Sequence, residues 1–231
     1  MIATEQFQQL TTDLQSAGAR LVAVSKTKPV EMIQSLYSLG QRDFGENRVQ
    51  ELVEKSKTLP ADINWHFIGH LQTKKVRQIA PFVQLIHAVD TEKLLLEIDK
   101  RAQQNQRQID CLLQFHIAEE TTKYGLSLAE AQSILENWKD LMATRTAEGQ
   151  SKLGARIIGV MGMATYTDDQ KQVRAEFERL AAIFANLKSE FFTDQPSFKE
   201  LSMGMSGDYP LALEAGSTIV RVGSLLFGAR R

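Results

Sequence analysis

The sequence predicts a single α/β domain over residues 1–231, folded as a closed (β/α)8 barrel of the TIM type. Eight short apolar segments alternate with amphipathic or polar segments, which is typical of parallel strands joined by crossover helices. Eight such units in a chain of this length favour a closed barrel over an open sheet. The alternative, a doubly wound open sheet, usually carries a glycine-rich fingerprint after its first strand, and none is present there.

The expected elements follow one another in a regular order along the chain. A helix over residues 3–18 precedes the first strand. The strands are expected within 21–26, 43–47, 65–70, 85–89, 111–117, 157–161, 200–203 and 218–222. The helices between them are expected at 30–39, 48–57, 73–79, 90–103, 126–138, 170–187 and 210–215. Two further segments, residues 143–156 and 189–198, are predicted to be exposed insertions rather than domain linkers, because the alternation resumes after each.

The composition argues against several classes of protein. With 27 basic and 28 acidic residues the net charge is -1, so nothing indicates a nucleic acid or an anionic membrane as a partner. The N-terminus lacks the pattern of a signal peptide, and no apolar run is long enough to span a bilayer. The single cysteine, Cys111, fits a reducing compartment. We therefore expect a cytoplasmic protein, and a monomer because no exposed apolar stripe stands out.

A lysine stands where the first strand ends. The run from Leu21 to Val24 is apolar, and Pro29 cannot donate to a strand ladder, so Lys26 is expected where a buried strand opens into its loop. Partial desolvation lowers the pKa of a lysine and yields a nucleophilic amine, which can form a Schiff base with an aldehyde. The alternative is a lysine whose amine simply reaches solvent at the strand end.

The segments after the seventh and eighth strands combine glycine with serine. Ser206-Gly207 lies in the first and Gly223-Ser224 in the second. Glycine lets a backbone approach a ligand closely, and the N-terminus of a helix favours an anion. In (β/α)8 barrels these two loops often bind a phosphate group. The alternative is that both serines are ordinary helix N-caps.

A Schiff-base lysine and a phosphate cradle together indicate pyridoxal 5'-phosphate (PLP), which has an aldehyde, a phosphate and a pyridine ring. Arg221 shares a face of the eighth strand with Gly223, because side chains two apart point the same way. An arginine in the barrel mouth needs a partner. The pyridine nitrogen is one candidate, and an ion pair with a neighbouring carboxylate is the alternative.

Seven sequence blocks resemble those of the YggS/PROSC-type PLP homeostasis proteins, also called the alanine racemase N-terminal-domain-like family. The blocks run from one end of the chain to the other, and their order and spacing agree with the family. They are AVSKTKP around Lys26, FGENRVQE at 44–51, WHFIGHLQTKK at 65–75, TKYG at 122–125, GVMGMATYTDD at 159–169, LSMGMSGDYPLALEAGST at 201–218 and VRVGSLLFG at 220–228.

The resemblance implies a single-domain PLP-binding barrel with a role in intracellular vitamin B6 homeostasis and amino-acid balance. It implies PLP held on a lysine as a Schiff base, with apo PLP enzymes as candidate recipients. The implied cofactor-binding residues are Lys26 at the aldehyde, Ser206, Gly207, Gly223 and Ser224 at the phosphate, Arg221 at the pyridine nitrogen and Asn47 near the cofactor. Two features depart from the family pattern: Lys74 stands where asparagine is usual, and the 143–156 segment is longer than the usual connection.

Robust catalysis is not expected. A racemase needs two acid/base groups on opposite faces of its substrate, and Lys26 supplies one. In racemases with this barrel the other comes from an additional β-domain and a partner subunit, and no such domain follows the eighth strand here. A permanently protonated Arg221 would also weaken the pyridine ring as an electron sink. We therefore assign no catalytic residue, and keep a weak amino-acid racemase or another PLP enzyme as the alternative.

A metal-dependent barrel hydrolase is a further hypothesis from a different class. Four histidines lie on or beside the third to fifth strands: His66, His70, His87 and His116. Their expected depths differ, and no short-spaced pair of metal ligands occurs among them. We therefore expect no metal site, and hydrogen-bonded structural roles for these side chains.

Overall fold

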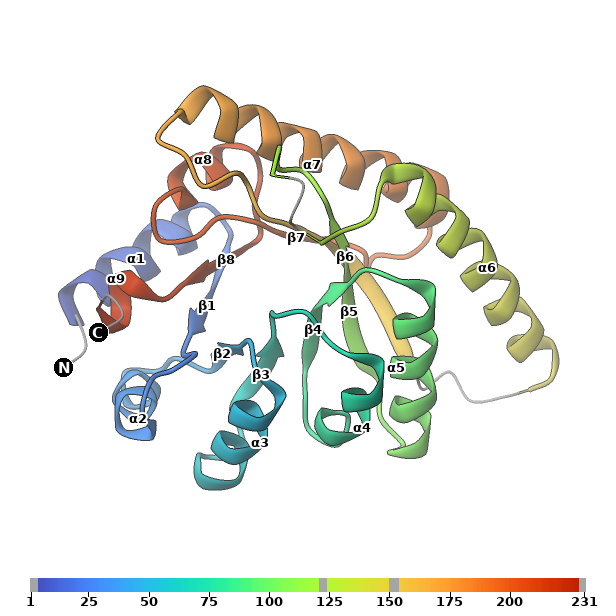
Figure 1. The fold of residues 1–231 in the computed structure, drawn as a ribbon, viewed down its shortest axis with the longest axis horizontal. Helices are drawn as coiled ribbons and strands as arrows, with labels where there is room; N and C mark the ends of the chain where they lie inside the picture. The colour runs from blue at the N-terminus through green and yellow to red at the C-terminus, as the bar shows by residue number, and fades with distance from the viewer. Residues whose placement is uncertain (1–3, 121–123, 150–153, 229–231) are drawn as a thin grey trace.

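The computed structural model describes residues 4–120, 124–149 and 154–228, and its eight parallel strands form a closed barrel in sequence order. The helices lie around the outside of the barrel (Figure 1). The predicted barrel is therefore confirmed. The strands are β1 (Arg20–Val24), β2 (Asp43–Glu46), β3 (Asn64–Phe67), β4 (Leu85–Val89), β5 (Ile109–Phe115), β6 (Ala155–Gly162), β7 (Glu200–Ser202) and β8 (Ile219–Val222).

The helices occupy most of the predicted positions. They are α1 (Thr4–Ser16), α2 (Val30–Ser38), α3 (Val49–Thr58), the 3-10 turn η1 (Thr73–Lys75), α4 (Val76–Ile79), α5 (Glu92–Gln104), α6 (Leu128–Ala147), α7 (Gln170–Phe191), α8 (Tyr209–Glu214) and α9 (Ser224–Phe227). The short α9 follows Gly223, where a helix N-terminus was expected although no range was given for the helix. Asp90 does not open α5, because Thr91 is its N-cap and accepts a hydrogen bond from the Leu94 N–H at 3.3 Å. Within the described residues, no helix is long and apolar enough to cross a membrane.

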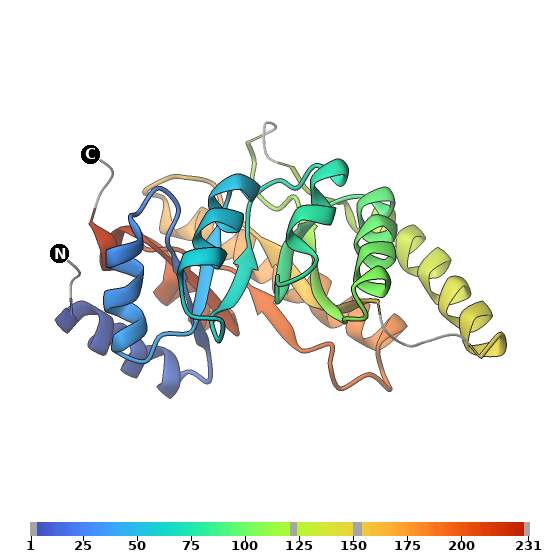
Figure 2. The same cartoon turned by 90° about the horizontal axis from the view of Figure 1, so that it is seen from below.

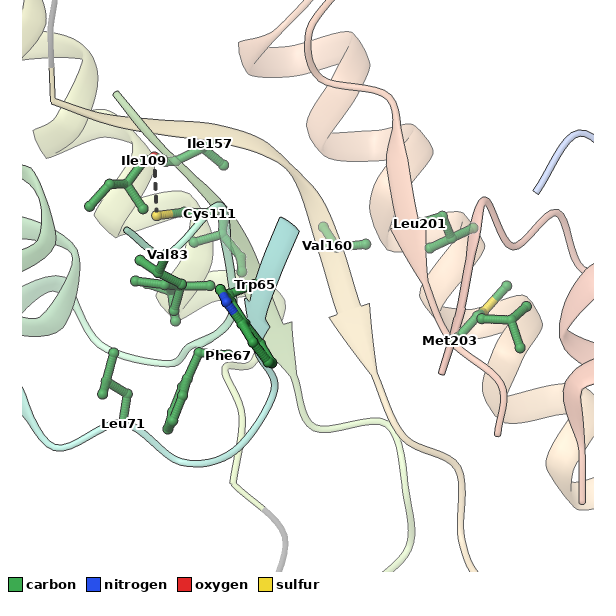
Figure 3. Close-up of a cluster of buried hydrophobic side chains, with 14 of the residues drawn as sticks. Trp65, Phe67, Leu71, Val83, Ile109, Cys111, Ile157, Val160, Leu201 and Met203 are labelled. Carbon is green, nitrogen blue, oxygen red and sulfur yellow. Dashed lines mark hydrogen bonds between the residues drawn. The ribbon is translucent and has the colours of Figure 1, made fainter. Parts of the chain in front are cut away.

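Two apolar clusters hold the barrel together. The larger one lies between strands and helices and includes Trp65, Phe67, Cys111 and Val160 (Figure 3). The smaller cluster of buried residues contains side chains from strands alone, so it fills the barrel interior. Its members are Val22, Leu85, Ala88, Leu112, Ile158, Met161 and Ile219. Burial of this much apolar surface on both faces of every strand is the main term that stabilises a parallel barrel.

The segment at 143–156 is exposed over most of its described residues, as predicted, but it is not an inserted loop. Residues 143–147 complete α6, and Ala155 and Arg156 begin β6. Residues 150–153 lie outside the described part of the chain. In Figures 1 and 2, α6 projects beyond the other helices, which is why its last turns are polar and read as a loop in the sequence.

A buried carboxylate explains the order of this region. Asp99 on α5 accepts hydrogen bonds from the Arg145 guanidinium at 2.6 Å and from the Ala155 N–H at 3.1 Å. Its side chain therefore ties the end of α6 and the start of β6 to the barrel, and the apolar pattern of the sequence carries no sign of such a contact.

The predicted insertion at 189–198 is also packed against the barrel. Residues 189–191 complete α7, and the rings of Phe192 and Phe198 stack with centroids 4.0 Å apart in the core. Aromatic stacking and burial stabilise this segment although its sequence is rich in polar residues.

We predict that Gly159→Ala destabilises the barrel strongly. A Cβ at this position in β6 would lie 1.8 Å from the Glu200 carbonyl oxygen on β7, and neither strand can move without breaking its ladder. We expect the free energy of unfolding to fall by about 3 kcal/mol or more, the upper range for overpacking. Chemical denaturation measures it.

Gly207→Ala is the matched control, because no atom lies within 4 Å of a Cβ built there. Equal stability of the two variants would contradict the prediction.

Candidate functional site

The residues singled out by the sequence gather at the C-terminal ends of β1, β2, β7 and β8. Lys26 lies two residues past β1, and Asn47 follows β2 directly. The parallel register pairs Ala23 with Phe44 on one side and with Val222 on the other, so the ends of β2 and β8 flank that of β1. The predicted group thus occupies one side of the barrel mouth.

The segment that carries Lys26 is a tight turn held at several points. The Lys28 N–H donates to the Ser25 carbonyl at 3.0 Å, and Thr27 has a φ of +64°, which is uncommon for a residue other than glycine. The Thr27 N–H donates to a carboxylate oxygen of Glu51. The Lys28 amine donates to the carbonyls of Phe227 at 3.1 Å and Gly228 at 3.0 Å. The turn is therefore fixed to both α3 and the end of α9.

A buried ion cluster supports this turn from below. The Lys55 amine lies 2.8 Å from a Glu46 oxygen, 2.6 Å from a Glu51 oxygen and 2.8 Å from the Ser25 carbonyl. The Ser25 hydroxyl donates to Glu46 at 2.6 Å. Burial raises the pKa of the Glu46 carboxyl, and the charge and hydrogen bond of Lys55 oppose that shift in part. Sequence reasoning missed this cluster, although Lys55 on the apolar face of a predicted helix was a signal.

Arg221 is buried inside the barrel. Its guanidinium donates to the Ser202 hydroxyl oxygen at 2.5 Å and to the Gly162 carbonyl at 3.0 Å. No salt bridge joins it to a carboxylate among the described residues, so the ion-pair alternative is wrong for that part of the chain. Burial lowers its pKa to about 10, partly offset by the charge of Asp208, and the group stays protonated near neutral pH.

The two glycine-serine segments lie next to each other at the mouth. The Gly223 N–H is 3.4 Å from the Ser206 hydroxyl oxygen, which links the segment after β7 to the segment after β8. Neither serine is an N-cap: α8 is capped by Asp208, and α9 is capped by Gly223 with Ser224 as its first residue. The N-cap alternative is therefore wrong. Gly207 has open space beside its Cα.

Glycine is required just before this segment. Gly204 has a φ of +90°, and a Cβ there would lie 2.6 Å from the Ala212 side chain. Its carbonyl accepts from the Arg221 N–H at 3.0 Å. The close approach packs α8 against the segment after β7, and the hydrogen bond to Arg221 holds that segment beside β8.

Asn47 carries an acceptor that is not satisfied. Its side-chain oxygen is buried and has no hydrogen-bond partner among the described residues. A hollow of about 320 Å³ lies beside it and is also lined by His70, Gln72 and Lys75. A buried acceptor without a donor costs about 1–3 kcal/mol, so a ligand that donates a hydrogen bond would be stabilised here.

The four histidines do not form one site. His66 and His87 meet inside the barrel, with ring nitrogens 3.0 Å apart. His70 pairs with Asp90 at 3.3 Å, and His116 lies 2.8 Å from the Glu120 carbonyl. No group of three potential metal ligands is found in the described ranges, so the metal-hydrolase hypothesis gains no support.

Comparison with known families places the chain. The family described as "Alanine racemase, N-terminal domain" matches residues 3–231. A pyridoxal phosphate homeostasis protein of Aquifex aeolicus is 37% identical over 214 residues, which cover 92% of this chain and 88% of the relative. Its namesake in Bos taurus is 35% identical over 228 residues, 94% of this chain and 80% of the relative.

Solved structures agree with this placement. PipY of Synechococcus elongatus is 33% identical and covers 97% of this chain and 99% of its own, with a TM-score of 0.85 without PLP and 0.83 with PLP bound. Alanine racemase of Bartonella henselae shares the fold at 17% identity, with a TM-score of 0.66, and the match covers 97% of this chain and 57% of that enzyme. The fold and the site define an alanine-racemase-type barrel. The chain belongs to the alanine racemase N-terminal domain family and, within it, to the pyridoxal phosphate homeostasis proteins.

We predict that Lys55→Met destabilises the protein far more than Lys57→Met. Removing the Lys55 amine leaves the buried Glu46 carboxylate without its counter-charge, which costs about 3–5 kcal/mol for a buried pair. Lys57 lies two residues on in the same helix and is exposed. Urea denaturation of both variants measures the difference, and similar midpoints would show that the cluster does not support the turn.

Proposed function

We propose that this protein binds PLP on Lys26 and serves intracellular vitamin B6 homeostasis as a carrier of the cofactor. One observation carries the proposal. The turn with Lys26 after β1 lies beside the glycine-serine segment after β8, and Arg221 on β8 is buried in the barrel and forms no salt bridge in the described part of the chain. These groups match the aldehyde, the phosphate and the pyridine nitrogen of one small molecule. The relative solved with PLP bound supports the assignment.

The covalent link uses the Lys26 amine. In its neutral form the amine adds to the aldehyde carbon, one water molecule leaves, and a carbon–nitrogen double bond remains. The fixed turn of residues 25–28 presents the amine from the same place in every molecule. No oxidant or further reactant is needed, and the bond is reversible by water, as a carrier requires.

The phosphate is assigned to Ser206, Gly207, Gly223 and Ser224. Backbone N–H groups at the first turn of a helix have no acceptor within that helix, and the two hydroxyls add further donors. The open space beside Gly207 and the contact between Ser206 and Gly223 make the two segments a single cradle. A phosphate there accepts hydrogen bonds from both segments.

The ring is assigned to Arg221 and Asn47. Arg221 stays protonated and can donate but not accept, so it pairs with an unprotonated pyridine nitrogen. The unsatisfied oxygen of Asn47 would accept from a donor of the bound molecule. The residues present therefore fit PLP.

The same arginine argues for carrying PLP rather than turning over amino acids. An unprotonated ring withdraws electrons weakly, so removal of the Cα proton from a bound amino acid gains little help. We propose that any racemase activity is weak, that apo PLP enzymes receive the cofactor, and that the protein acts as a cytoplasmic monomer. Its exposed large apolar side chains are scattered among loops and helices: Leu39, Leu96, Tyr124 and Tyr166.

We predict that Lys26→Ala abolishes covalent attachment of PLP. The wild-type protein should show a visible absorbance band that borohydride fixes onto the peptide containing Lys26. The variant should lack both the band and the labelled peptide because its side chain has no amine. Lys57→Ala, which removes an exposed lysine elsewhere, should label like the wild type. A colourless wild type that fails to take up added PLP would end the proposal.

We predict that the PLP-loaded protein exchanges the Cα proton of alanine with deuterated water no faster than free PLP does. The reason is the weak electron withdrawal of a ring paired with Arg221. Proton NMR of the amino acid over time measures the exchange. Exchange well above the free-PLP rate, lost in Lys26→Ala, would favour the racemase alternative.

A further inference from the structure

A line of buried hydrogen bonds runs across the barrel interior to Arg221. Asp43 at the start of β2 lies 3.0 Å from His66 Nε2, and His66 Nδ1 lies 3.0 Å from His87 Nε2. His87 Nδ1 lies 3.1 Å from the Ser202 hydroxyl oxygen, which accepts from the Arg221 guanidinium at 2.5 Å. These residues come from β2, β3, β4, β7 and β8, so five strands contribute one residue each to four links.

With both rings neutral, the carboxylate end fixes the direction of every link. An ionised Asp43 can only accept, so His66 carries its hydrogen on Nε2 and accepts on Nδ1. His87 must then donate from Nε2 and accept on Nδ1. The Ser202 hydroxyl therefore gives its hydrogen to His87 and keeps a lone pair for Arg221, which can only donate. The donor-only guanidinium is compatible with this direction, and this arrangement of protons satisfies all the links.

An added proton would disturb this arrangement. If His66 carried two hydrogens, Nδ1 would donate to His87, and His87 would donate from Nδ1 to Ser202. The Ser202 oxygen would then face two donors, and its own hydrogen would have no acceptor in the line. An unpaired polar group at a fully buried site costs about 1–3 kcal/mol, so the neutral state of both rings is favoured.

The surroundings of this line of hydrogen bonds also favour an ionised Asp43 and a neutral His87. Burial raises the pKa of the Asp43 carboxyl. The hydrogen bond from His66, the charge that His66 would carry when protonated, the charge of Arg20 and a hydrogen bond from Asn64 together outweigh burial, and the pKa is lowered. Burial, with the positive charges of Arg221 and Arg20, holds the pKa of His87 well below its usual range, and a proton on His66 would lower it further. Near neutral pH the line therefore joins a carboxylate at one end to a guanidinium at the other through a neutral His87.

We propose that Asp43, His66, His87 and Ser202 are positioning residues, with Asp43 selecting the proton arrangement that holds the Arg221 guanidinium at the barrel mouth. Ser202 is the side-chain acceptor of Arg221 in the described part of the chain. Because the Ser202 hydroxyl donates its hydrogen to His87, one of its lone pairs points toward the Arg221 guanidinium. The part of this proposal in which the positioned guanidinium binds a pyridine nitrogen rests on the proposed function. The proton arrangement of the four side chains does not depend on that function.

The first test uses the ligand-free protein labelled with 15N-histidine. Two-bond 1H–15N spectra near pH 7 should show both His66 and His87 neutral, each with its hydrogen on Nε2. In Asp43→Asn the charge that selects this arrangement is gone, and a second tautomer should appear for both rings. Asp110→Asn is the matched control, because Asp110 pairs with Arg156 at 2.7 Å away from the line and should leave the spectrum unchanged.

A wild-type ring with its hydrogen on Nδ1, or a doubly protonated ring, would overturn the proposal. Unchanged tautomers in a folded Asp43→Asn would overturn it too. These results do not depend on PLP, so they are separable from a failure of the proposed function, which would appear as no PLP uptake by the wild type.

Ser202→Ala tests the mouth end and remains informative if Asp43→Asn does not fold. We expect both rings to keep Nε2–H, since Asp43 still selects it, and PLP to bind roughly tenfold more weakly, as for one lost hydrogen bond to a charged group. Titration of the visible band measures that affinity. An unchanged affinity beside wild-type tautomers would show that the line does not position Arg221.

Discussion

The pairing of β8 with β1 is the interaction on which the whole mouth depends. Four residue pairs join the two strands, and they bring Lys26 and Gly223, almost two hundred positions apart in the sequence, to neighbouring strand ends. A Cβ on Gly223 would lie 3.0 Å from the Val24 carbonyl, so the two backbones are in close contact. The Lys28 amine adds a second tie to the end of α9. Closing so long a loop costs conformational entropy, and the apolar layers on both faces of the strands offset it.

The polar groups of the barrel fall into two sets that differ in how fully they are satisfied. Deep in the interior, the line from Asp43 to Arg221 satisfies every link in one proton arrangement. At the mouth, one oxygen each of Glu46 and Asn47 is buried without a partner among the described residues. An apolar interior would be simpler to stabilise, because each buried polar group must recover its lost hydration. The satisfied set builds a rigid frame, and the unsatisfied set lies where the proposed ligand would complete the bonding.

The sequence predicted the architecture, and it predicted that the candidate residues lie at the barrel mouth, because both depend on local patterns. Strand and helix periods, and a lysine before a proline, can be read within a few residues. The contacts that order the rest are not local. Asp99 reaches Arg145 on another helix, and the apolar period of α6 carries no trace of that bond. The pairing of His66 with His87 was also missed. Their inward direction could have been inferred from strand alternation, but a barrel interior gives no sequence sign of which inward side chains meet.

The interior line and the chemistry of the mouth are connected through charge. Arg221 is buried without an ion pair in the described chain, and a second positive charge beside it would lower its pKa further below about 10. A neutral His87 avoids that. Burial and the nearby positive charges of Arg221 and Arg20 keep the pKa of His87 low, and the carboxylate of Asp43 directs its hydrogen away from Ser202. The frame that fixes the position of the guanidinium therefore also preserves its charge. We infer that a group held so firmly in its donor state favours retention of a ring acceptor over the proton shuttling that turnover of amino acids would require.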